Sequence, residues 1–111
     1  MNDTAVPTAR GDAGQHRESI LRQLDQILAS RLFKHSRRCG PLLSYVVTEA
    51  LEGRAERLKE RTIGVEVFGR KPDYDTATDP IVRTTASEVR KRIAQYSHEH
   101  GSTAVAWIDL A

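Results

Sequence analysis

The sequence predicts a mostly α-helical protein with one strand near the C-terminal end and an aliphatic core, and one observation supports each part of that prediction. Apolar residues recur at intervals of three and four in three separate stretches, which is the spacing of amphipathic helices. A segment near the C-terminal end alternates in the manner of a strand. Aromatic residues make up only 5% of the chain, so the core is expected to consist mainly of Leu, Ile, Val and Ala.

The composition bounds the class of protein. With 39% hydrophobic and 29% charged residues, the chain has the balance of a soluble globular protein and not of a disordered one. The 17 basic and 15 acidic residues give a net charge of only +2, so nucleic-acid binding has to be argued from where the charges lie. A single cysteine, Cys39, and the lack of a long apolar run predict a cytoplasmic protein without membrane association.

The N-terminal part of the chain divides into a tail and a helix. Residues 1–14 lack apolar periodicity and are predicted to be a flexible tail, and residues 15–111 a single domain. Residues 15–32 are predicted to form an amphipathic helix with one apolar stripe. This stripe either packs on the rest of the domain or pairs with its copy in a homodimer. Its members are Ile20, Leu21, Leu24, Ile27, Leu28 and Leu32.

Two further helices are expected in the middle of the chain. The first spans 36–53, with Ser36 as a plausible cap, Pro41 in the first turn and Gly53 ending the helix in a left-handed conformation. The second spans 57–69. Its segment "TIGVEVFG" is compatible with a strand as well as a short helix, and the charged lead-in "RAERLKER" favours the helix.

The stretch "DPIVRTTASEVRKRIAQY" predicts a helix over 79–100, with Asp79 as N-cap and Pro80 as its first residue. One side is apolar and consists of Val82, Ala86, Val89, Ile93 and Tyr96. The opposite side carries Thr84, Ser87, Lys91 and Gln95, with Arg83, Arg90 and Arg92 at its borders. Small hydroxyls and cations suit close approach to a nucleic-acid duplex, although the same face also fits an ordinary solvated surface.

The order of these elements is that of a winged helix-turn-helix: support helix, positioning helix, loop, recognition helix and wing. The expected wing strand covers residues 103–110. Because no second strand follows it, the predicted fold is a mostly α winged helix-turn-helix with an extra N-terminal helix and an incomplete or partner-completed β wing. A homodimer through the strand at 104–110 is one way to complete it.

The segment "VFGRKPDYDTATDPIVRTTASEVRKRI" resembles the end of the OmpR/PhoB-type DNA-binding domain. Phe68 and Gly69 match that family's aromatic–Gly pair, and the residues from Ser87 to Ile93 match its recognition helix except at Glu88. A closer resemblance, over roughly residues 33–110, is to bacterial regulatory N-terminal modules that share the "TIGVEVFGR" and "DPIVR" patterns. The OmpR/PhoB-type domains begin with a small β-platform, where this chain has the helix at 16–32.

This resemblance implies a sequence-specific regulator of transcription that binds double-stranded DNA, with the helix at 79–100 in the major groove. The alternative is a protein–protein interaction module of the same fold in bacterial signalling. No enzymatic activity, metal or small-molecule cofactor is expected, because no catalytic or ligand constellation stands out. The expected DNA contacts are Arg83, Thr84, Ser87, Arg90, Lys91, Arg70, Lys71, Arg37 and Arg38.

Overall fold

The computed structural model describes the backbone of residues 5–100 and the side chains of residues 16–100. This part of the chain is mostly helical, as predicted, and contains no strand. The predicted wing strand at 103–110, and any dimer contact through 104–110, lie outside the described residues. The elements are α1 (Ala5–Ala29), α2 (Cys39–Leu51), the short 3₁₀-helix η2 (Ala55–Leu58), α3 (Glu60–Phe68) and α4 (Ile81–His100).

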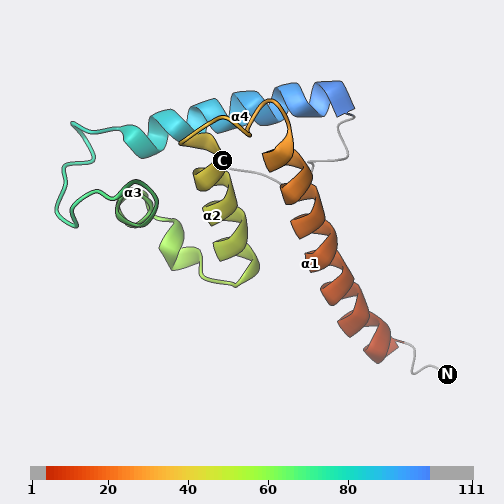
Figure 1. Ribbon diagram of the computed structural model, residues 1–111. Helices are drawn as coiled ribbons and strands as arrows, with labels where there is room; N and C mark the ends of the chain where they lie inside the picture. The colour runs from red at the N-terminus through yellow and green to blue at the C-terminus, as the bar shows by residue number, and fades with distance from the viewer. Residues whose placement is uncertain (1–4, 101–111) are drawn as a thin grey trace.

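Helix α2 lies at the centre of the arrangement and contacts α1, α3 and α4 (Figure 1). It runs antiparallel to α1, because the guanidinium of Arg17 donates to the Leu51 carbonyl at 3.2 Å, while Gly40 at the other end of α2 lies near Leu28. Helix α4 crosses one end of this pair, and the N-terminal part of α1 extends away from it (Figure 1). The placement of α4 decides which of its sides remains accessible.

The core is built from the apolar stripes of these helices. The predicted stripe of α4 is confirmed, except that Ala86 is only partly buried and that Ile81 and Thr85 are also buried. On α1, Ile20, Leu24 and Ile27 are buried within the same chain, and each such side chain contributes about 1.5–3 kcal/mol. The buried part of the α1 stripe therefore packs on its own domain, and pairing of α1 with its copy in a homodimer stays a prediction.

The ends of α1 differ from those predicted. The helix begins at Ala5, so residues 5–14, predicted as a flexible tail, are helical. Extending an existing helix needs no new nucleus, and Pro7 falls in the first turn, where its missing N–H is not required. The helix ends at Ala29 instead of residue 32, because the amide and hydroxyl of Ser30 both donate back to the Ile27 carbonyl, at 3.1 and 2.6 Å.

Helix α2 is shorter than the predicted 36–53. It begins at Cys39, whose amide donates to the Ser36 hydroxyl at 2.8 Å, so Ser36 caps the helix from three residues away. Pro41 lies in the first turn, as expected. The helix ends at Leu51, and Gly53 adopts the predicted left-handed conformation with φ of 75°.

The segment predicted as one helix over 57–69 is interrupted. Lys59 is extended, with φ −74° and ψ 147°, and it separates η2 from α3. The stretch "TIGVEVFG" therefore lies mainly in a helix and not in a strand. Gly69 ends α3 with φ of 67°, a conformation that glycine adopts without steric cost.

The connection from α3 to α4 is held against α3 by Tyr74. The Tyr74 ring rests on Gly64, where a Cβ atom would lie only 2.1 Å from the phenol oxygen. Arg61 donates to the Pro72 carbonyl at 3.1 Å and lies 5.6 Å from the centre of the Tyr74 ring. This long loop consequently has a defined path, which leads the chain into α4.

Candidate nucleic-acid interface

The outward side of α4 is arranged as the sequence predicted. Thr84, Ser87, Lys91 and Gln95 are all exposed, whereas Val89 on the opposite side is fully buried. The regular 100° rotation per residue separates these two sets. Helix α4 thus presents small hydroxyls and a lysine away from the core.

A groove of about 370 Å³ lies between the start of α2 and the first half of α4, and we call it the basic groove. It brings together Arg37 and Arg38, which precede α2, and Thr84 on α4, three of the nine expected DNA contacts. The N-terminus of α2 adds a partial positive charge there. Its lining residues are Ser36, Arg37, Arg38, Cys39, Thr84, Thr85, Glu88 and Arg92.

The charges that line the basic groove do not cancel. Arg92 Nε lies 3.1 Å from Glu88 Oε2, so these two charges neutralise each other, and Arg92 also donates to the Leu32 carbonyl at 2.6 Å. The exposed Arg37 and Arg38 form no salt bridge within residues 16–100. Three arginines against one glutamate leave a formal charge of +2 on the lining of this groove.

Arg70, another expected DNA contact, has a structural partner. Its Nε donates to Asp79 Oδ2 at 2.7 Å, just before α4 begins. This hydrogen bond is the main reason that the pKa of Asp79 is lowered, and the Ile81 amide and the charge of Arg38 act in the same direction. The first helical residue is Ile81 and not Pro80, whose carbonyl accepts from the Thr84 amide at 2.9 Å, so the predicted N-cap Asp79 lies two residues before the helix.

The remaining expected contacts lie elsewhere on the surface. Arg83 pairs with Glu60 of α3, which draws its guanidinium toward that helix. Arg90 is exposed on α4, and Lys71 is exposed in the loop after α3. These residues therefore do not line the basic groove.

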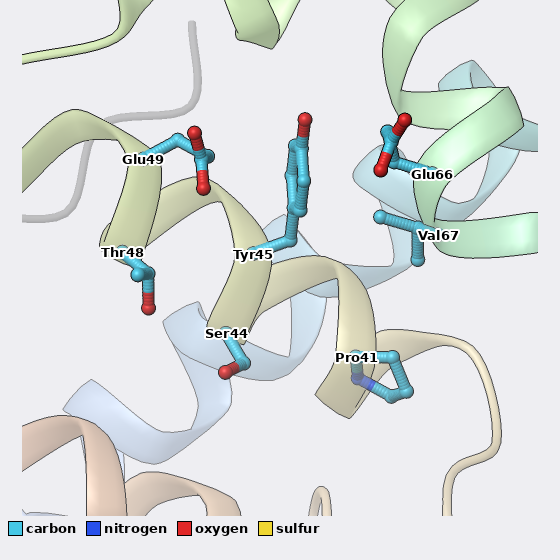
Figure 2. Close-up of a pocket in the computed structure, with 7 residues that line it drawn as sticks. All are labelled: Pro41, Ser44, Tyr45, Thr48, Glu49, Glu66 and Val67. Atoms are coloured by element: carbon cyan, nitrogen blue, oxygen red, sulfur yellow. The ribbon is translucent and has the colours of Figure 1, made fainter. Parts of the chain in front are cut away.

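A second groove, of about 380 Å³, lies between α2 and α3 on another side of α2, and we call it the acidic groove. Figure 2 shows the Tyr45 ring standing between Glu49 of α2 and Glu66 of α3. The Tyr45 hydroxyl donates to the Arg57 carbonyl at 3.0 Å. The full lining is Pro41, Ser44, Tyr45, Thr48, Glu49, Glu66 and Val67.

The two glutamates of the acidic groove are neutralised by arginines of the same chain. Arg54 Nε donates to the buried Glu49 at 2.7 Å, which lowers the pKa of Glu49 and raises that of Arg54. Arg57 Nε lies 3.1 Å from the same glutamate oxygen, as an ion pair without a hydrogen bond, and Arg57 Nη2 lies 3.5 Å from Glu66 Oε1. This cluster fastens the end of α2 to η2 and α3.

The sequence contained a signal for the ion pair of the basic groove but not for the ion-pair cluster of the acidic groove. Glu88 and Arg92 are four residues apart on one helix, a spacing that favours an ion pair. The cluster around Glu49 joins three separate elements, and no local spacing predicts it.

A scan against protein-family models, a search of curated proteins and a search of solved structures found no match to this chain. Among the described residues, no three His, Cys, Asp or Glu side chains are grouped so that they could hold a metal ion. None of the helices searched in that part of the chain is both long and apolar enough to span a membrane.

Proposed function

We propose that the protein is a sequence-specific DNA-binding regulator of transcription, with the outward face of α4 in the major groove of double-stranded DNA. The observation that carries the proposal is the basic groove, which joins Arg37 and Arg38 to Thr84 of α4 across two elements. Phosphate contacts fix the position of a protein on DNA, and side chains at base edges read the sequence. Both kinds of side chain occur here on adjacent surfaces.

The two parts of the surface have different roles in this proposal. Arg37 and Arg38 hold backbone phosphates beside the N-terminus of α2. Thr84 and Ser87 are small, so the helix can approach the base edges closely, and Lys91 adds a phosphate contact one turn further on. Arg70 positions α4 through Asp79 and contributes to DNA binding chiefly in that way.

A salt titration with fluorescently labelled duplex DNA tests the proposal. Binding should weaken steeply as salt rises, with a slope that reflects about five to eight phosphate contacts. The double variant Arg90→Ala with Lys91→Ala should lose DNA binding while it remains folded, because both residues are exposed on α4. Arg22→Ala, which removes an exposed arginine from α1, serves as the matched control and should bind nearly as well as the parent.

Weak binding without salt dependence would contradict the proposal. The alternative function, a winged-helix module that binds another protein, predicts that Arg90→Ala with Lys91→Ala leaves duplex affinity unchanged. Circular dichroism of each variant separates a loss of binding from a loss of fold.

A further inference from the structure

Glu88 is the only acidic side chain among the described residues that line the basic groove. A carboxylate at this place repels phosphate unless its charge is compensated. In the structure that compensation comes from Arg92, whose Nε lies 3.1 Å from Glu88 Oε2. Glu88 is therefore compatible with a nearby DNA backbone.

Arg92 also fixes the direction of the Glu88 carboxylate. A second nitrogen of Arg92 donates to the Leu32 carbonyl at 2.6 Å, so the guanidinium is held from two sides. The Glu88 side chain nevertheless stays 46% exposed. Since a carboxylate accepts up to about four hydrogen bonds, the one from Arg92 leaves room for a donor from outside.

The position of Glu88 on α4 places it beside a residue expected at the bases. Thr84 lies one turn earlier on the same side of the helix, and both residues line the basic groove. Arg37 and Arg38 line it from the α2 side. A duplex whose phosphates contact these arginines would therefore lie along the same groove as Thr84 and Glu88.

We infer that Glu88 is a specificity-determining residue that selects a cytosine at one position of the DNA site. A carboxylate only accepts hydrogen bonds, so guanine and thymine, which present acceptors in the major groove, are disfavoured there. Cytosine offers its N4 amino group, whereas adenine places the N7 acceptor next to its N6 donor. The inference rests on the proposed function and adds a base preference to it.

Binding selection from a pool of randomised duplexes tests this inference on the full chain. The parent should enrich cytosine at one position by about 5- to 150-fold over the disfavoured bases. Glu88→Gln should shift that position toward adenine, because an amide pairs with adenine N6 and N7, and Glu88→Ala should lose the preference. Glu66→Gln is the matched control, since Glu66 is also 46% exposed and ion-paired to an arginine but lies on the acidic groove.

Two results would overturn the inference. If the parent binds DNA with steep salt dependence but Glu88→Gln and Glu88→Ala keep the same base preferences, the inference fails and the proposed function stands. If the parent binds no duplex at any salt concentration, both fail. Thermal unfolding of each variant ensures that a change in preference is compared between folded proteins.

Discussion

The two grooves that flank α2 carry similar residue types but handle charge differently. In the acidic groove, Glu49 and Glu66 are neutralised by Arg54 and Arg57. In the basic groove, Arg92 neutralises Glu88, while Arg37 and Arg38 form no salt bridge within residues 16–100. An arginine that already holds a carboxylate of its own chain stabilises the fold, whereas one that faces solvent beside a helix N-terminus is suited to bind an anion.

Removing the arginines associated with each groove should have different consequences, and this effect is the largest of those that distinguish the two grooves. Arg37→Ala with Arg38→Ala should lower duplex affinity about 10- to 100-fold and reduce the salt slope by about two, with little change in Tm. Arg54→Ala with Arg57→Ala should instead lower the Tm, because Glu49 is left buried without its partners. Anisotropy titrations and thermal melts of both pairs check this, and equal effects on affinity would contradict the distinction.

Gly64→Ala should disturb the packing of the loop between α3 and α4, which Tyr74 holds against α3. A Cβ atom at this position would lie 2.1 Å from the Tyr74 hydroxyl oxygen, so the ring has to move. The cost should exceed the gain in helix propensity and lower the free energy of unfolding by about 1–2 kcal/mol in chemical denaturation.

A double-mutant cycle with Tyr74→Ala provides the control for Gly64→Ala. Once the ring is absent, Gly64→Ala should cost little or become stabilising. A full cost in both backgrounds would mean that Tyr74 does not cause the loss.

The acidic groove should make the fold sensitive to acid. The hydrogen bond from Arg54 lowers the pKa of Glu49 in the folded protein below its ordinary value of 4.5. The ionised Glu49 therefore contributes fully to the stability of the fold above pH 4.5. This contribution is lost as the pH falls through the lower pKa that Glu49 has in the folded protein. Denaturation at about pH 7, 5 and 3 should show a decline in stability at the acid end that is smaller in Glu49→Gln. An unchanged decline in this variant would exclude Glu49 as a contributor.

The smallest effect is expected from the cap of α2. Ser36→Ala removes the hydroxyl that accepts the Cys39 amide and should cost about 1 kcal/mol of stability, with a modest loss of DNA affinity, because Arg37 and Arg38 follow directly. Ser44→Ala, on the acidic groove, is the matched control and should change stability by less than about 0.5 kcal/mol. Equal effects of the two substitutions would argue against the cap.

The sequence by itself determined that the described part of the chain is mostly helical and which side of α4 is buried, whereas the ends of α1 and α2 and the break at Lys59 were not predicted. The stripe from Val82 to Tyr96 and the exposed Thr84, Ser87 and Lys91 follow from a helical period of 3.6 residues, a local property of the chain. The left-handed conformation of Gly53 was likewise predictable, because a residue without a Cβ adopts a positive φ without steric cost wherever it lies in the fold.

The tertiary structure alone decided which charges are available. In the sequence, Arg70 and Arg83 are cations like Arg37 and Arg38. In the structure, Arg70 is paired with Asp79 and Arg83 with Glu60. These partners are 9 and 23 residues away along the chain, so no helical period reports them. An arginine's role depends on which carboxylates the packing of α2, α3 and α4 brings within reach, and that distance is a property of the folded chain.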